Sequence, residues 1–201
     1  MRAAAGLWVG LLLMCGFAVE SRAAFLVLED SRYVKLDGDT QHPDPAESLF
    51  ASSLGVPGNP AVFANQASTV IGDLDGQGAV GTGGAANLVD SVFDVLFKVD
   101  GPLHFTLFGN LSGGPDVVTG FLSDSNGIFH LLDGDFLVEG NLQPDLTYRL
   151  FVGVISIDGG TQNQGQWEVH LVPEPASADL LALLGFVALA RVTRRSSLLA
   201  R

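Results

Sequence analysis

Apolar and polar residues alternate with a period of two through much of the second half of the chain. Segments 92–99, 103–110 and 166–172 each carry apolar side chains at every second position. Successive side chains of a β-strand point to opposite faces, so this pattern predicts strands with one buried face and one solvated face. In segment 166–172 the alternation turns Trp167 inward and places Gln166, Glu168 and His170 on the other face.

Shorter apolar runs extend the prediction to a whole domain. Further strands are expected at 25–28, 33–36, 117–122, 128–132, 136–140 and 146–157, with the first two forming an opening hairpin or a sheet edge. Asn126-Gly127 and Asp133-Gly134 are typical turn dipeptides. Many short strands with regular turns and little helical periodicity predict an all-β fold, an antiparallel β-sandwich. The order of a Tyr148 strand, a glycine-rich loop and a Trp167 strand resembles the last strands of jelly-roll domains.

The first half of the chain is rich in proline and glycine segments that predict loops. Segments 37–51 and 55–60 hold much of the proline and predict loops. Segment 76–84 is dense in glycine and predicts either a flexible surface loop or a close crossing of two backbones. Its Gly-x-Gly-x-x-Gly spacing lacks the flanking strand and helix that a dinucleotide site requires, so that site is excluded.

The N-terminal segment, residues 1–23, has the layout of a secretory signal peptide. Arg2 precedes an apolar or small-residue run over residues 3–19, and small residues allow a cut after Ala23. The alternative is a membrane anchor that stays attached, since the run lies at the lower limit of a spanning helix. Met14 before Cys15 argues against a lipoprotein site.

The C-terminal segment, residues 173–201, has three parts in a fixed order. Pro173, Glu174 and Pro175 come first, and the prolines end the preceding strand. An apolar helix is then expected to enter the membrane through Leu180, Leu181, Leu183, Leu184, Phe186, Val187 and Leu189. The basic residues Arg191, Arg194 and Arg195 follow, which predicts that they stay in the cytoplasm while the bulk of the chain lies outside.

This order resembles a PEP-CTERM sorting signal, a C-terminal tag of proteins exported by Gram-negative bacteria. The resemblance implies recognition by an exosortase, a membrane-embedded cysteine transpeptidase, with a cut near Pro-Glu-Pro and release to the envelope or matrix. The chain then divides into a signal peptide (1–23), an acidic β-sandwich domain (24–172) and the sorting signal (173–201). Two alternatives stay open for this end, a plain stop-transfer anchor and a glycolipid-anchor signal.

Charge and cysteine content narrow the range of functions. Residues 24–172 contain 19 acidic and 4 basic side chains, a net charge of −15. Phosphate contacts need clustered Lys and Arg, so nucleic acid is not an expected partner. The single cysteine of the chain, Cys15, lies in the signal peptide, so the domain has neither a disulfide nor a thiolate metal site.

The candidate chemistry is limited to one cation hypothesis. Asp73 and Asp75 lie together before the predicted strand core, and paired carboxylates suit Ca²⁺. An ordinary solvated turn is the alternative, and no other cofactor is expected. No serine or cysteine lies in a nucleophile motif, and nothing local indicates a pair of glycosidase carboxylates.

Taken together, these patterns predict a non-enzymatic, exported protein with a structural or adhesive role at the cell surface or in an extracellular polysaccharide matrix. Its expected partners are the secretion machinery, an exosortase and extracellular polysaccharide, with membrane contact through the C-terminal helix. One alternative is a carbohydrate-binding module that can depend on Ca²⁺, although an inward Trp167 argues against an aromatic binding platform. The other is a plain membrane-anchored envelope protein.

Overall fold

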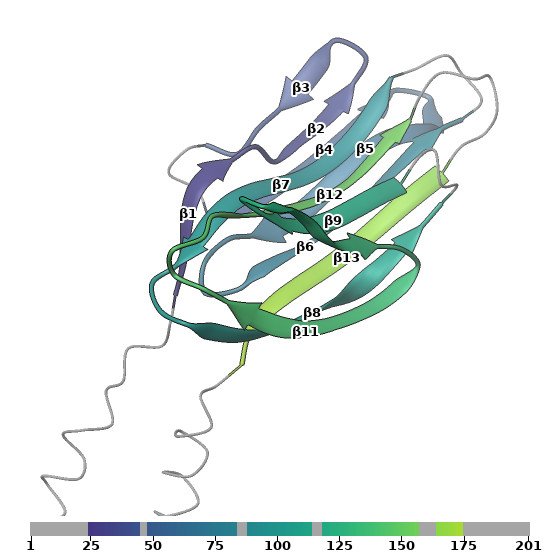
Figure 1. Cartoon of the computed structure of the whole chain (residues 1–201). Helices are drawn as coiled ribbons and strands as arrows, with labels where there is room; N and C mark the ends of the chain where they lie inside the picture. The colour runs from purple at the N-terminus through teal and green to yellow at the C-terminus, as the bar shows by residue number, and fades with distance from the viewer. Residues whose placement is uncertain (1–23, 45–47, 84–87, 114–117, 157–163, 175–201) are drawn as a thin grey trace, which may run out of the picture. The chain divides into compact units, whose positions relative to one another are not determined.

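The domain consists of strands arranged in two antiparallel sheets (Figure 1). We describe it from a computed structural model, for residues 24–44, 48–83, 88–113, 118–156 and 164–174. These residues belong to one compact unit that ends at Glu174. The predicted all-β class with antiparallel sheets is therefore confirmed.

The first sheet has seven strands in the order β10-β9-β12-β7-β2-β3, and β1 also pairs with β7. Its strands are β1 (Phe25–Asp30), β2 (Tyr33–Leu36), β3 (Asp39–Gln41), β7 (Val89–Val99), β9 (Val118–Asp124), β10 (Gly127–Leu132) and β12 (Tyr148–Ser156). β1 and β2 do not form a hairpin, the first of the two expected arrangements, and β1, which pairs with β7, is an edge strand as in the second. They pair one after the other with successive halves of β7, Phe25 opposite Val99 and Tyr33 opposite Val92.

The second sheet has six strands in the order β11-β8-β13-β6-β5-β4. They are β4 (Leu49–Val56), β5 (Asn59–Thr69), β6 (Leu74–Thr82), β8 (Leu103–Ser112), β11 (Asp135–Leu142) and β13 (Gln164–Pro173). β13 lies in the interior of this sheet, with β8 on one side and β6 on the other. The last strand of the domain therefore lies between two strands from the middle of the chain.

The hydrophobic core lies between the two sheets. It contains the fully buried rings of Phe93, Phe97 and Phe105, and Trp167 of β13 contacts Phe93 of β7 across the interface with ring centroids 5.9 Å apart. The Trp167 Nε1–H donates to the carbonyl oxygen of Ser91 at 3.1 Å, so the buried indole has a partner for its polar atom. The inward orientation predicted for Trp167 is confirmed.

Two glycines of β6 make room for this indole. A Cβ atom built on Gly78 would lie 2.6 Å from Trp167 Nε1 and would also collide with Ser91 Oγ, and one built on Gly76 would lie 3.0 Å from the indole ring. The segment expected to be a flexible loop or a close crossing of two backbones is thus largely a buried strand, and at these two positions the glycines make room for a side chain and not for a second backbone. The loops expected at 37–51 and 55–60 are wrong in part, since residues 39–41 form β3 and residues 49–51, 55–56 and 59–60 belong to the β4–β5 hairpin.

A buried arginine joins the two sheets. The Arg32 side chain is 0% exposed and its Nε and NH2 groups donate to Asp30, at 2.5–3.0 Å. Its NH1 group donates to the carbonyl oxygens of Ser48 and Ser68, at 3.2 Å and 3.1 Å, next to the ends of the β4–β5 hairpin. Arg32 lies between β1 and β2, so this side chain ties the first sheet to the second.

Candidate binding face of the six-stranded sheet

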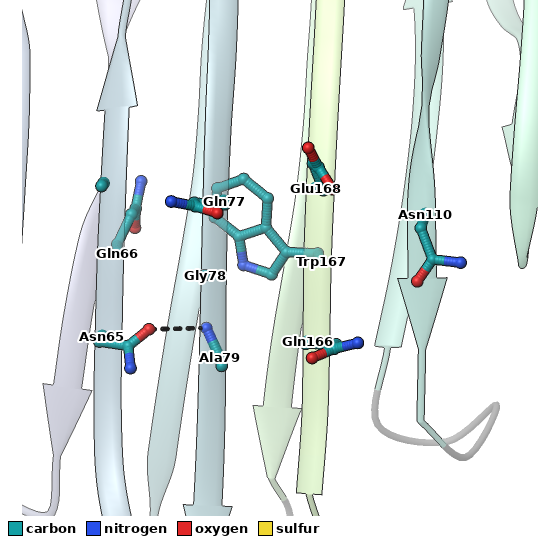
Figure 2. A pocket seen from close by; sticks show the side chains of 10 residues that line it. Asn65, Gln66, Gln77, Gly78, Ala79, Asn110, Gln166, Trp167 and Glu168 are labelled. Atoms are coloured by element: carbon teal, nitrogen blue, oxygen red, sulfur yellow. Dashed lines mark hydrogen bonds between the residues drawn. The ribbon is translucent and has the colours of Figure 1, made fainter.

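The outward face of the six-stranded sheet carries a hollow of about 310 Å³ that is rich in amide side chains. We call it the polar hollow and define it by the polar side chains of Asn65, Gln77, Asn110, Gln166 and Glu168. Figure 2 shows these side chains on four neighbouring strands, β5, β6, β13 and β8. Its volume is at the lower end of the range for small-molecule and cofactor sites, about 300–1,000 Å³.

The strand register explains why these residues meet. Glu168 of β13 lies opposite Gln77 of β6 on one side and opposite Asn110 of β8 on the other. Neighbouring strands are about 4.8 Å apart, so a row of polar side chains crosses three strands over about 10 Å. Gln166 lies one pleat further along the same face, opposite Ala79.

Small side chains form the hollow itself. Ala67 and Ala79 point outward between the larger polar residues, so the surface is lower at these positions. Asn65 Oδ1 accepts a hydrogen bond from the backbone N–H of Ala79 at 3.1 Å, which holds the carboxamide across β5 and β6 (Figure 2). Asn110 Nδ2 donates to Asp135 Oδ1 at 2.5 Å, which holds the opposite side of the hollow.

A second hollow of about 320 Å³ adjoins the first and shares Ala67, Gln77 and Glu168 with it. Its distinctive feature is His170, whose Nδ1 lies 2.5 Å from Asp75 Oδ2 and whose Nε2 lies 2.8 Å from Glu168 Oε1. The imidazole also stacks on Phe108 of β8, with ring centroids 4.7 Å apart. The histidine is therefore held by contacts to three strands, β6, β8 and its own β13.

These contacts favour the charged form of the imidazole. Partial burial lowers the pKa of His170, but the hydrogen bonds to Glu168 and Asp75 and the charges of the two carboxylates outweigh it and raise the pKa above its ordinary value. With both ring nitrogens facing carboxylates, the protonated ring donates two charge-assisted hydrogen bonds. One positive charge is then shared between two negative charges.

The polar hollow has the chemistry to bind hydroxyl groups. Each carboxamide offers a carbonyl oxygen as acceptor and an NH₂ group as donor, and a sugar hydroxyl needs both. Among the described residues, Gln77 and Gln166 make no side-chain hydrogen bond, so their amides face solvent ready for a ligand. Next to this row, Phe108 is 40% exposed and Leu137 of β11, opposite it, is 68% exposed, which adds apolar surface for the C–H groups of a sugar ring.

The two aspartates predicted as a cation site lie in different local surroundings. Asp73 is exposed in the bend before β6, while Asp75 points outward from β6 and pairs with His170. Within the described part of the chain, no group of three or more His, Cys, Asp and Glu side chains is arranged to hold a metal ion. The Ca²⁺ site stays a prediction.

The beginning of the predicted sorting motif is part of the fold. Pro173 is the last residue of β13, and Glu174 follows with its backbone N–H donating to the carbonyl oxygen of His104 at 2.9 Å. The Glu174 carboxylate accepts from Thr106 Oγ1 at 2.5 Å and lies 2.8 Å from His104 Nδ1, and the Thr106 bond followed by the His104 contacts lowers the pKa of Glu174. Ala23, Pro175, the apolar run from Leu180 to Leu189 and the arginines Arg191, Arg194 and Arg195 lie outside the described residues.

Sequence reasoning recognised one side of this binding face and missed the other. The alternation in β13 already placed Gln166, Glu168 and His170 on one solvated face. The partners Asn65 and Gln77 were missed because β5 and β6 were not recognised as strands. Within β5, hydrophobicity gave no clear signal, because the outward face includes Phe63 and the inward face includes Gln66.

No family model matches the chain, and neither a curated protein nor a solved structure matches it. The part of the chain that the structure describes includes no helix with the length and apolar character needed to cross a membrane.

Proposed function

We propose that this protein is an exported, non-enzymatic module with a jelly-roll-like β-sandwich that adheres to extracellular polysaccharide through the polar hollow. The observation that carries the proposal is the row of outward amides and Glu168, which crosses the centre of the six-stranded sheet. Sugar hydroxyls are matched by these paired donors and acceptors, and the adjoining Phe108 and Leu137 supply apolar contact. A structural or adhesive role at the cell surface then follows from binding the matrix.

Delivery to that location is the second part of the proposal. The signal peptide at 1–23 directs export, and the Pro173-Glu174-Pro175 motif with its apolar run and arginines is read by an exosortase. The compact unit ends at Glu174, inside the Pro-Glu-Pro motif, which supports a boundary between domain and tag at this motif. The membrane contact is transient, and the mature protein resides in the envelope or matrix.

The sorting part predicts a specific mature end. In cells of the native host, the mature chain is expected to end near Pro175, because the transpeptidase cuts at the motif. Mass spectrometry of the intact protein measures this end. A chain that still ends at Arg201 would instead indicate a plain membrane anchor and would contradict the sorting proposal while leaving the binding proposal standing.

The binding part predicts the effect of removing amides. We expect the purified protein to be retained on a polysaccharide affinity gel, and the double variant Gln77→Ala, Gln166→Ala to bind about tenfold more weakly. Each neutral hydrogen bond contributes about 0.5–1.5 kcal/mol, and 1.4 kcal/mol is a factor of ten in affinity. Both residues lie on exposed positions, so folding is expected to be preserved.

Gln143→Ala is the matched control, since this exposed glutamine lies in the turn between β11 and β12, outside the polar hollow. It should bind as the wild type does. Retention that is equal in all three proteins would place the binding elsewhere, and no retention on any of a panel of neutral, cationic and anionic polysaccharides would refute the proposed function.

A further inference from the structure

The basic residues of the domain are confined to one sheet. Lys35, Lys98 and Arg149 lie on β2, β7 and β12 of the seven-stranded sheet, and Arg32 is buried between β1 and β2. The six strands of the other sheet contain neither lysine nor arginine. The face that carries the polar hollow therefore offers a ligand no permanent positive charge from its own strands.

Negative charge, by contrast, surrounds the polar hollow. Glu168 lies in its centre with 54% of its side chain exposed, and Asp75 lies beside it with 44% exposed. Asp135 and Glu139 follow on β11, where the alternation turns them to the same outward face. The carboxylates are thus spread over three strands, β6, β13 and β11, on the same face as the amides that offer donors and acceptors for hydroxyl groups.

His170 does not cancel this charge. When protonated, its ring balances one of the two carboxylates that it contacts, Asp75 and Glu168, and one negative charge is left over. The ring is 22% exposed and is stacked on Phe108, so its position is fixed by packing. The hollow therefore remains electronegative whether or not the histidine carries its proton.

We propose that the ligand of the polar hollow is a polysaccharide that carries ammonium groups, namely a partly or fully deacetylated amino-sugar polymer. This inference rests on the proposed function and names its ligand class. Hydroxyls of such a polymer pair with the amides of Gln77 and Gln166, while an ammonium group donates charge-assisted hydrogen bonds to Glu168, about twice as strong as neutral ones. An anionic polymer would bring its charges against this carboxylate-rich face and is repelled.

The test compares three hexasaccharides of equal length by isothermal titration calorimetry with the full-length purified protein. The probes are a fully deacetylated glucosamine oligomer, the corresponding N-acetylglucosamine oligomer and an oligouronate. At about pH 6 the amino groups of the deacetylated oligomer are protonated. At about 0.1 M salt the Debye length is about 10 Å, so salt does not fully screen the attraction between an ammonium group and a carboxylate in the hollow. We expect the deacetylated oligomer to bind at least about tenfold more tightly than the acetylated one, with no detectable binding of the oligouronate.

Two matched variants test whether the negative charge of Glu168 causes the tighter binding of the deacetylated oligomer. Glu168→Gln keeps the shape of the side chain and removes one negative charge from the hollow, so it should weaken the deacetylated oligomer more than the acetylated one. Glu29→Gln removes the same charge from β1 of the other sheet, outside both hollows, and should leave the titration as in the wild type. Far-UV circular dichroism checks that both variants are folded.

The outcomes separate the two proposals. Equal binding of the acetylated and deacetylated oligomers, or tighter binding of the oligouronate, overturns the ligand class and leaves polysaccharide binding intact. Equal weakening by Glu29→Gln and Glu168→Gln overturns it as well, because the effect would then come from the net charge of the domain. Failure of all three probes, together with no retention on polysaccharide gels, overturns the proposed function itself.

Discussion

Replacing Trp167 with alanine is expected to destabilise the domain by about 3–5 kcal/mol, the usual cost of removing a fully packed Trp from a core. The indole is 2% exposed, it contacts Phe93 of the opposite sheet, and its Nε1–H donates to the Ser91 carbonyl oxygen. Removing it leaves a cavity against Gly76 and Gly78, where no side chain can fill the space. Urea unfolding followed by far-UV circular dichroism measures the loss.

Two variants control this result. Trp167→Phe keeps an aromatic ring but loses the donor, so we expect a smaller loss than for alanine. Gln166→Ala, at the exposed neighbouring position, is expected to change stability by no more than about 0.5 kcal/mol. A loss below about 1 kcal/mol for Trp167→Ala would mean that the indole is not packed between the sheets as described.

Replacing Asp30 with alanine is expected to cost about 3 kcal/mol or more. The guanidinium of Arg32 is fully buried, and the change removes the carboxylate that accepts from both its Nε and NH2 groups. Breaking a buried ion pair by removing one partner costs far more than the loss of an exposed ion pair. The same urea titration gives the free energy of unfolding.

A second Arg–Asp pair of nearly identical geometry provides the control. Arg149 donates from Nε and NH2 to Asp94 at 2.8 Å and 2.5 Å, but its side chain is 49% exposed. Asp94→Ala should therefore cost no more than about 1 kcal/mol, because water replaces the lost partner. If Asp30→Ala and Asp94→Ala lower the free energy of unfolding by similar amounts, the burial of Arg32 does not determine the effect of removing its partner.

The sequence predicts the strands correctly where apolar residues occupy every second position without interruption. Val95, Phe97 and Val99 of β7 are all buried, as their spacing predicts, and the same holds for Trp167, Val169 and Leu171 of β13. The pattern is less informative in β6, where Gly76 and Gly78 occupy inward positions. A hydrophobicity pattern reads these glycines as a break in the strand, although they are there because the indole from β13 needs the space.

The pairing of strands that are far apart in the sequence is the second feature that the local pattern does not predict. The binding face depends on Glu168 lying between Gln77 and Asn110, which are about 91 and 58 positions away along the chain. The local pattern of β13 does not specify those neighbours. The sequence therefore predicted the solvated face of β13 but not the residues of β6 and β8 that lie beside it. The contacts of His170 with Asp75 and Glu168 were not predicted for the same reason. Asp75 was interpreted instead as part of a cation site.

The place of β13 has a mechanical consequence if, as proposed, the protein is held by its C-terminal end. Glu174 is bonded directly to β8, so a pull on the chain beyond it loads β13 without slack. In antiparallel sheets the backbone hydrogen bonds lie perpendicular to the strands, so tension along β13 shears both of its ladders, to β6 and to β8, at once. Both ladders beside β13 would then resist a pull from the proposed point of attachment together.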